Sequence, residues 1–216
     1  MTTSAPVESE KPNGPRSRKG AQTRARLLEA AKHVFEEDGF LDARVTDIAE
    51  RAGLSHGSFY HYFESKEEIF REVAATVDER LSAPLGAVIM DPSSRATPQE
   101  RIREAMRLYF ESYRAQAKIM GLIEQVSRYD EEVGAVRRAR HLRYAEQIAE
   151  SIRQMQRHGL ADSKLNPEIA AHGLGSMTSR FAEQWLVQRA FSCSLEDAVD
   201  QLSLLYVNAM GLDDLR

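Results

Sequence analysis

The fold is decided by the stretch Val45-Thr46-Asp47-Ile48-Ala49-Glu50-Arg51-Ala52-Gly53-Leu54-Ser55-His56-Gly57-Ser58-Phe59-Tyr60-His61-Tyr62-Phe63. Two short helices are predicted on either side of Gly53, because glycine permits the positive φ that a tight turn needs. Ala49 is small where the helices must cross, and Ile48 and Leu54 can fill the wedge between them. Ser55 is a favourable N-cap for the second helix. The pattern is typical of a helix-turn-helix, whose second helix enters the DNA major groove.

The second of these helices begins with small and polar side chains, which let its backbone come close to base edges: Ser55, His56, Gly57 and Ser58. Tyr60, His61 and Lys66 follow at positions from which they can reach phosphates. The alternative is a helical hairpin whose aromatic cluster is simply core. We expect Phe59 and Phe63 to be buried, and Tyr60 and His61 to be exposed.

Outward from this stretch, apolar residues recur at helical spacing and no segment alternates like a strand. Ser65 and Glu68 form a capping box for a helix that we expect to end near Leu81, before Pro84. Asn166 followed by Pro167 predicts another helix start. The chain is therefore predicted to be all-α with about nine helices, at about 22–39, 45–53, 55–62, 65–81, 98–113, 117–128, 131–158, 167–191 and 194–209. We divide it into a disordered basic arm (1–20), a helix-turn-helix domain (21–66) and a larger helical domain (67–216).

The composition is that of an ordinary globular protein, with 42% apolar and 29% charged residues among 216. No run approaches ~18 apolar residues, so no transmembrane helix is expected. The single cysteine, Cys193, can form neither an intrachain disulfide nor a cysteine-cluster zinc site, and the polar N-terminus does not resemble a secretory signal. We expect a cytoplasmic protein.

An enzyme is the main alternative of another class, and the sequence gives it little support. The chain has no glycine-rich phosphate loop, nucleophile elbow or H-E-x-x-H motif. Its six histidines are scattered without metal-ligand spacing. We therefore expect no catalytic residue, cofactor or metal.

Charge is distributed unevenly along the chain, although its net value is only −4. One segment carries cations and no acid: Lys11, Arg16, Arg18, Lys19, Arg24 and Arg26. A basic arm on an acidic body steers one end of the molecule towards an anion such as DNA. The alternative is a tail that only aids solubility.

Residues 23–70 resemble the DNA-binding domain of TetR-family transcriptional regulators. The resemblance rests on Phe35-x-x-x-Gly39-Phe40, on Val45-x-x-Ile48-Ala49-x-x-Ala52-Gly53-Leu54-Ser55, on Gly57-Ser58-Phe59-Tyr60-His61-Tyr62-Phe63, and on Ser65-Lys66-Glu67-x-Ile69. It implies a dimeric, all-helical repressor that binds a palindromic operator through the first domain and a small molecule through the second. The implied DNA-binding residues, with the basic arm added, are Arg16, Arg18, Lys19, Arg44, Thr46, Ser55, His56, Gly57, Ser58, Tyr60, His61 and Lys66.

One position departs from the family pattern. Residue 44 is often a threonine that caps the helix after it, and here it is Arg44. Losing a helix cap costs about 1 kcal/mol. Our hypothesis is that Arg44 instead holds a DNA phosphate through its charge.

The second domain carries methionine and aromatic stripes on separate helices, which suit an adaptable apolar pocket. The alternative is plain core packing. We expect an apolar or amphipathic effector, bound by Met106, Tyr109, Phe110, Tyr113, Met120, Glu124, Tyr144, Met177, Phe181 and Trp185. Other polar candidates for orienting it are Gln125, Arg180 and Gln184.

A basic run lies on the predicted 131–158 helix: Arg137, Arg138, Arg140, His141 and Arg143. It is either an anion site, for example for coenzyme A phosphates, or a solvated face. In the second case we expect the arginines to pair with Glu131, Glu132 and Glu146.

The last two helices are predicted to pair with their copies in a second chain, through Leu186, Ala190, Leu202, Leu205, Tyr206 and Ala209. A palindromic operator needs this dimer, because two recognition helices must reach major grooves about 34–36 Å apart. Ligand binding would change that separation. The remaining alternatives are an activator, a ligand-independent DNA-binding protein, or an interaction module that does not bind DNA.

Overall fold

The computed structural model describes residues 18–89 and 95–212, with side chains placed throughout except at 82–89. Helices account for the regular structure of these two ranges, and strands are absent from them. The helices are α1 (Arg18–Asp42), α2 (Val45–Arg51), α3 (His56–Phe59), α4 (Lys66–Ile89), α5 (Pro98–Ala115), α6 (Ala117–Val126), α7 (Glu131–Arg157), α8 (Pro167–Ala182), the π-helical turn Glu183–Val187, and α9 (Leu195–Met210). The predicted all-α class is confirmed.

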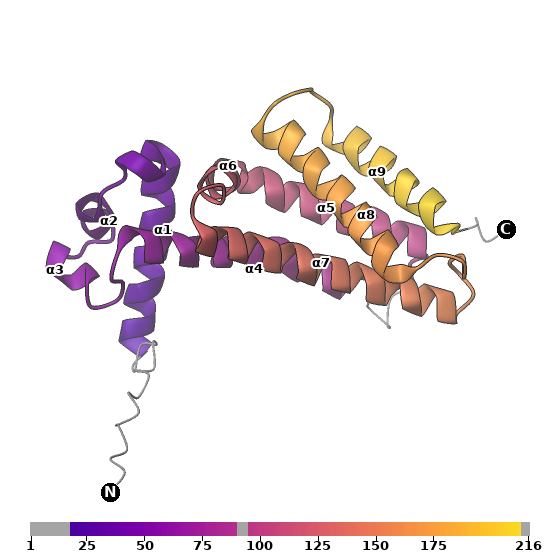
Figure 1. Ribbon diagram of the computed structural model, residues 1–216, viewed down its shortest axis with the longest axis horizontal. Coiled ribbons are helices and arrows are strands. Elements are labelled where there is room, and N and C mark those ends of the chain that lie inside the picture. Colours follow the sequence, from indigo (N-terminus) through magenta and orange to yellow (C-terminus); the bar gives the residue numbers. More distant parts are fainter. Residues whose placement is uncertain (1–17, 90–94, 213–216) are drawn as a thin grey trace, which may run out of the picture.

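Two domains are visible in the ribbon view. Helices α1 to α3 form a small domain at one end, and α5 to α9 form a larger bundle at the other (Figure 1). Helix α4 leaves the small domain and runs into the bundle, packing on α1, α5 and α7. Helix α6 also packs on α1. In the described part of the chain, α4 and α6 therefore provide the main contacts between the two domains.

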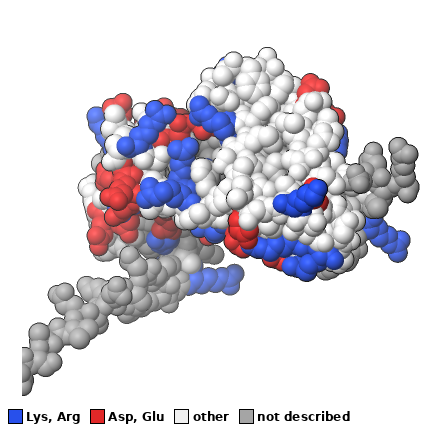
Figure 2. All heavy atoms as spheres, turned by 45° about the vertical axis from the view of Figure 1, so that its right-hand side comes forward, with Lys and Arg blue, Asp and Glu red and all other residues white. Residues whose placement is uncertain are grey.

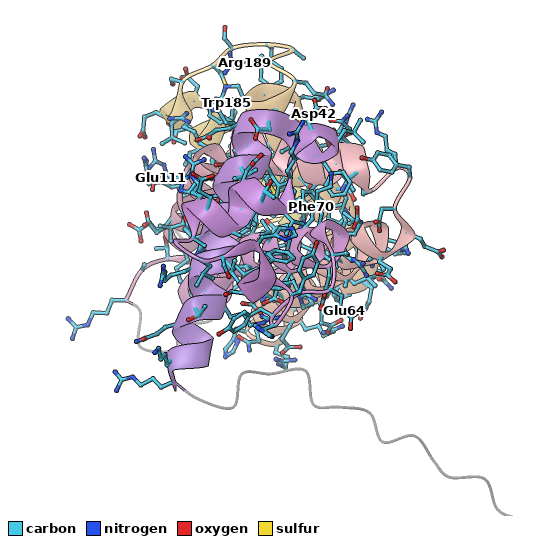
Figure 3. All side chains as sticks on the ribbon, turned by 90° about the vertical axis from the view of Figure 1, so that its left-hand side faces the viewer. Asp42, Glu64, Phe70, Glu111, Trp185 and Arg189 are labelled. Atoms are coloured by element: carbon cyan, nitrogen blue, oxygen red, sulfur yellow. The ribbon has the colours of Figure 1, made fainter. Side chains whose placement is uncertain are left out.

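The small domain is held to α4 by an aromatic cluster. Phe70 of α4 makes edge contacts with Phe35 and Phe40 of α1, with ring centroids 4.9 and 4.8 Å apart. Figure 3 looks onto this end of the molecule and shows Phe70 inside it. Ile48 and Phe59 add fully buried side chains from α2 and α3. Because these buried side chains come from α1, α2, α3 and α4, the small domain and the first turns of α4 form one packed unit.

Most of the predicted helix caps are present. Ser55, Asn166 and Ser194 each accept a backbone hydrogen bond at the start of the following helix. The Ser65 hydroxyl accepts from the Glu68 amide at 3.1 Å, but the Glu68 carboxylate accepts from the amide of Glu64 rather than that of Ser65. The start of α4 thus has the expected hydroxyl cap. The returning bond of the capping box goes to the amide one residue earlier than in the standard motif.

The end predicted for α4 is wrong, since the helix continues through Pro84 to Ile89. Proline has no amide hydrogen, so it leaves the carbonyl four residues earlier without its helical donor. In this chain that carbonyl belongs to Arg80, and it accepts the hydroxyl of Ser112 on α5 at 3.3 Å. The neighbouring helix supplies the missing donor, which allows α4 to continue.

Two other boundaries differ from expectation. Helix α1 begins at Arg18, so the last three residues assigned to the disordered arm are helical. The helix predicted to reach residue 191 instead changes to a π-helical turn after Ala182. Among the described residues, no helix is long and apolar enough to cross a membrane.

Candidate functional site

The turn between α2 and α3 has the predicted geometry. Gly53 has a φ of 66°, and the amide of Leu54 donates to the carbonyl of Ala49 at 2.9 Å. The guanidinium of Arg26 on α1 donates to the carbonyl of Ala52. The Ser55 hydroxyl accepts from the amide of Ser58 at 3.3 Å. The turn is therefore fixed from both sides, and the start of α3 is held in one orientation.

The start of α3 presents small polar groups to solvent. Ser55, His56 and Gly57 are exposed, and no described heavy atom would lie within 4 Å of a Cβ added at Gly57. Phe59 is fully buried beneath them, whereas the Tyr60 side chain is 50% exposed. Phe63 is buried and His61 is exposed as well, which confirms the expected division between core and surface.

The position before α2 also faces solvent. Arg44 is the N-cap residue of α2, and in the described part of the chain its side chain makes no capping hydrogen bond. Both Arg44 and Thr46 are exposed, and the Thr46 hydroxyl contacts the Asp47 carboxylate at 3.1 Å. Arg44 thus keeps its charge at the surface, beside the helix-turn-helix.

The basic residues near the N-terminus have divided roles. Arg18 and Lys19 are exposed in the first turn of α1, and Arg16 lies outside the described residues. Arg24 pairs with Glu72 of α4 and stacks over the ring of Phe63 at 4.7 Å. Of the described cations in the basic segment, Arg24 and Arg26 therefore bind the protein itself.

Lys66 is similarly engaged. Its ammonium donates to the carbonyl of Leu41 at 3.0 Å and lies 5.0 Å from the ring centroid of Phe40. This contact joins the start of α4 to the end of α1. The sequence pattern gave no sign of this structural role, because it depends on which helix end the lysine meets in space.

A cavity of about 260 Å³ lies between α7 and α8. Its lining residues are Arg137, His141, Tyr144, Ala145, Ala171, His172, Gly175, Ser176, Ser179, Arg180 and Glu183. Of the ten predicted ligand-binding residues, Tyr144 is the one that lines this cavity in the described part of the chain.

The structure packs most of the other predicted ligand-binding residues into the core of the larger domain. Tyr109 stacks on Tyr144 with ring centroids 5.7 Å apart, and Phe110 lies 5.7 Å from both Phe181 and Trp185. Met106, Tyr113 and Met120 are buried, Met177 and Glu124 are half-buried, and Glu124 pairs with Arg128 at 2.6 Å. These side chains form a packed cluster that meets the cavity through Tyr144.

The basic run on α7 does not pair as the solvated-face alternative expects. Arg140 and Arg143 both pair with Asp78 of α4, which is only 2% exposed. Arg137 approaches the carboxylate of Glu183, also buried, at 3.6 Å. The partners are therefore buried acids on other elements rather than Glu131, Glu132 and Glu146, because the head groups of Arg137, Arg140 and Arg143 reach across to α4 and to the π-helical turn.

Glu183 opens the π-helical turn and gathers polar contacts. Arg180 donates to its carboxyl at 2.7 Å and Gln188 at 2.8 Å. Burial and a hydrogen bond with Glu124 raise the pKa of Glu183. The pKa of Glu124 is lowered, because the hydrogen bond from Glu183 and the pairing with Arg128 outweigh its burial.

His141 contributes little charge to the cavity. Burial, followed by the nearby charges of Arg140 and Arg137, lowers its pKa to about 4. Its imidazole is therefore neutral near pH 7 and acts as a hydrogen-bonding group.

The predicted dimer residues fall into two sets. Leu202 and Tyr206 are buried within their own chain, and the Tyr206 hydroxyl contacts that of Thr178 at 2.8 Å. Their assignment to the interface is corrected, because this side of α9 packs on α5. Ala190, Leu205 and Ala209 are exposed, and Leu186 is half-buried.

The exposed side of α8 and α9 is unusually poor in charge. Neither α8 between Ile169 and Ser179 nor α9 between Gln201 and Met210 contains a charged residue. Figure 2, which brings this side of the larger domain forward, shows a broad area nearly free of charged side chains. Ile169, Leu204 and Leu205 are exposed there.

Comparison with known proteins finds similarity to bacterial transcriptional regulators. The family model for "Bacterial regulatory proteins, tetR family" matches residues 27–73. The transcriptional regulator UidR of Escherichia coli is 27% identical over 158 residues, which is 73% of this chain and 74% of UidR. The regulator YdgC of Bacillus subtilis is 46% identical over 63 residues, but the match spans only 29% of this chain and 32% of YdgC.

Solved structures share the whole fold. A putative TetR-family regulator from Mesorhizobium loti superposes with a TM-score of 0.77 at 19% identity, covering 89% of this chain and 98% of that one. A second, from Rhodococcus, gives 0.70 at 19% identity, covering 88% and 99%. The chain therefore shares a sequence pattern over residues 27–73 with the tetR family model, and most of its helical fold with these two solved structures.

Proposed function

We propose that the chain is a DNA-binding transcriptional regulator of the TetR family, and that it acts as a homodimeric repressor of a palindromic operator rather than as an enzyme. A small molecule bound in the larger domain releases it from DNA. Its place of action is the cytoplasm, where the operator lies.

One observation carries the DNA-binding part of this proposal. The start of α3 exposes Ser55, His56 and Gly57 while Phe59 fixes the helix from below. A helix that presents small polar groups on a rigid support can enter the major groove without steric conflict. We assign base contacts to these three residues and to Ser58.

Phosphate contacts are assigned to the exposed cations and hydroxyls around α3. They are Arg44, Thr46, Tyr60 and His61, with Arg18 and Lys19 at the start of α1. Arg16 extends this set but lies outside the described residues. Lys66 takes a positioning role, because its ammonium is bound to the Leu41 carbonyl at 3.0 Å.

The charge-poor α8–α9 face, which includes Ile169, Leu204 and Leu205, supports a dimer of this chain. Interface cores are depleted in charged residues. Here exposed leucines and small residues lie on two helices that belong to the domain farther from the DNA. A second copy seated on this face would carry a second recognition helix, as a palindromic operator with half-sites about 34–36 Å apart requires.

Release by a ligand follows from the position of α4. Its first turns pack with the small domain through Phe70, and its later turns pack on α5 and α7. A ligand that changes the packing of α7 shifts α4, and the two recognition helices then no longer match their grooves. By linkage, DNA must weaken ligand binding by the same factor.

The test is selection of DNA from a random library by the purified protein, followed by binding measurements at several salt concentrations. We expect one palindromic sequence. With about six phosphate contacts per complex, its affinity should fall on the order of 10³-fold between 50 and 200 mM salt. Arg44→Ala should weaken binding to all sequences alike. Enrichment of no sequence, or of one without two-fold symmetry, would contradict the proposal.

A further inference from the structure

The cavity between α7 and α8 has a charged end. Arg137 from α7 and Arg180 from α8 both reach Glu183, at 3.6 and 2.7 Å. The side chains of Arg137 and Arg180 are 29% and 55% exposed, whereas that of Glu183 is 8% exposed. All three residues line the cavity, and the two arginine side chains are more exposed to solvent than that of Glu183.

Positive charge dominates this end. The guanidinium groups of Arg137, Arg180 and Arg128 stand against the carboxyls of Glu183 and Glu124, and the pKa of Glu183 is raised by burial and by its bond with Glu124. His141 is neutral near pH 7. Each guanidinium has five N–H donors, and the contacts with Glu183 use only some of them. Donors thus remain available for a second acceptor.

The rest of the cavity is narrow and lined by small groups. Ala145, Ala171 and Gly175 line it beside the ring of Tyr144. A Cβ added at Gly175 would lie 3.2 Å from that ring, so a larger residue there would crowd it. The volume of about 260 Å³ is just below the usual ~300–1,000 Å³ of small-molecule sites.

We propose that this cavity binds a small organic carboxylate, with Arg137 and Arg180 holding the carboxylate and the body of the molecule lying against Tyr144 and Gly175. Arginine suits this role, because its planar group donates paired hydrogen bonds to a carboxylate. The next step rests on the proposed function: this ligand is the effector that releases the protein from DNA.

Side chains that line the cavity lead directly to α4. His141 contacts the Ser179 hydroxyl at 3.4 Å and the Arg140 guanidinium at 3.1 Å. Arg140 in turn lies 3.6 Å from the buried carboxylate of Asp78 on α4. A ligand that draws His141 or Ser179 towards itself therefore disturbs the contact by which α7 holds α4.

The first experiment measures binding to the full-length protein by isothermal titration calorimetry. The probes are benzoate, phenylacetate and hexanoate, each compared with its uncharged amide. We expect at least one acid to bind at least tenfold more tightly than its amide. Arg180→Gln and Arg137→Gln should each weaken that acid at least tenfold. Arg138→Gln removes a charge from the neighbouring exposed position outside the cavity and should leave binding unchanged.

Circular dichroism and the thermal midpoint of each variant establish whether it is folded. Because two arginine variants are made separately, the test can still be read if one of them does not fold. If no acid binds more tightly than its amide, or if the loss is the same in Arg138→Gln, the carboxylate site is wrong. These results do not depend on DNA, so they separate failure of this site from failure of the proposed repressor.

The second experiment adds the acid that binds to a complex of the protein with its selected operator. We expect the operator affinity to fall at least fivefold in wild type and to be unaffected in Arg180→Gln. An acid that binds in the cavity without changing operator affinity would overturn the effector role.

Discussion

At the residue scale, two glycines four positions apart have opposite requirements. Gly53 has a φ of 66°, and a Cβ there would lie 2.9 Å from the Arg26 guanidinium. Gly53→Ala should therefore lower the free energy of unfolding by about 1–3 kcal/mol, the usual cost of a strained backbone. Urea denaturation measures this change, and equal stability of variant and wild type would show that the turn tolerates a side chain.

Gly57→Ala is the matched variant, because the added methyl meets no described atom within 4 Å. Its stability should be unchanged or higher by roughly 0.5–1 kcal/mol, as for glycine replaced within a helix. If α3 enters the major groove, the methyl lies against the bases and operator affinity falls at least tenfold. Unchanged affinity in a fluorescence anisotropy titration would place Gly57 away from DNA.

His141 predicts a pH dependence of stability. Its pKa in the folded protein is about 4, below the ~6.5 of an unfolded chain. The folded state thus binds fewer protons than the unfolded state at low pH. The contribution of His141 to the free energy of unfolding is therefore complete above about pH 6.5 and is lost as the pH falls towards 4. Because the side chain is partly exposed, we expect an effect on the order of 1 kcal/mol.

The measurement compares wild type with His141→Gln at pH 7.5 and pH 5 by urea denaturation. The wild type should lose more free energy of unfolding than the variant over this interval, since the other histidines are common to both. An identical pH dependence in the two proteins would mean that His141 is protonated as readily in the folded state as in the unfolded one.

The roles of short side chains could be predicted from the sequence, whereas the contacts of long cationic side chains could not. Ser55 and Gly53 act on their own backbone, so their roles follow from neighbouring residues. The head group of Arg26 reaches the Ala52 carbonyl, 26 residues away, and that of Lys66 reaches the Leu41 carbonyl. A long, flexible side chain such as that of lysine or arginine can meet many partners, and only the packed fold selects one.

At the element scale, helix starts were easier to predict than helix ends. The starts of α3, α8 and α9 depend on a capping residue next to them. Helix α4 passes its predicted end at Leu81, and the carbonyl of Arg80 that Pro84 leaves without a helical donor accepts from Ser112 of α5, a partner distant in sequence. The position of the cavity was predicted only in part, since Tyr144, Arg180, Arg137 and His141 were candidates but the methionine and aromatic stripes were expected to line it. It lies where α7 crosses α8, and the aromatic stripes that suggested a pocket pack against one another instead.

Asp78 is the residue through which α7 holds α4. Asp78→Asn removes the charge that compensates Arg140, whose side chain is only 13% exposed. Breaking one side of a buried pair costs about 3–5 kcal/mol, and we expect the lower end because the Arg143 side chain is 56% exposed. The same variant should reduce the factor by which the effector weakens DNA binding.

The control for this experiment is Glu79→Gln, which removes the next charge on α4 from an exposed position. Urea denaturation measures the free energy of unfolding. Operator titrations with and without effector measure the factor by which the effector weakens DNA binding. A variant as stable as the control would show that the Asp78 pairs contribute nothing net. A variant that is less stable but keeps the full effector response would restrict Asp78 to a structural role.

At the scale of the whole molecule, the charge-poor α8–α9 face predicts the oligomeric state. Leu205 is 49% exposed and lies beside Leu204 on a helix face without charge. In a homodimer, Leu205→Glu places two carboxylates in one interface, where each loses its hydration without gaining a partner. We expect the wild type to be a dimer and the variant a monomer by light scattering coupled to size exclusion.

The monomer should also bind the palindromic operator at least 10²-fold more weakly, because only one half-site is then occupied and the second contact no longer adds to the first. Leu41→Glu is the control, since it places the same charge on an apolar side chain that is 74% exposed in the other domain. It should remain dimeric. A wild type that is monomeric at micromolar concentration, or a Leu205→Glu variant that stays dimeric, would move the interface away from this face. The two recognition helices would then have to be paired by another surface.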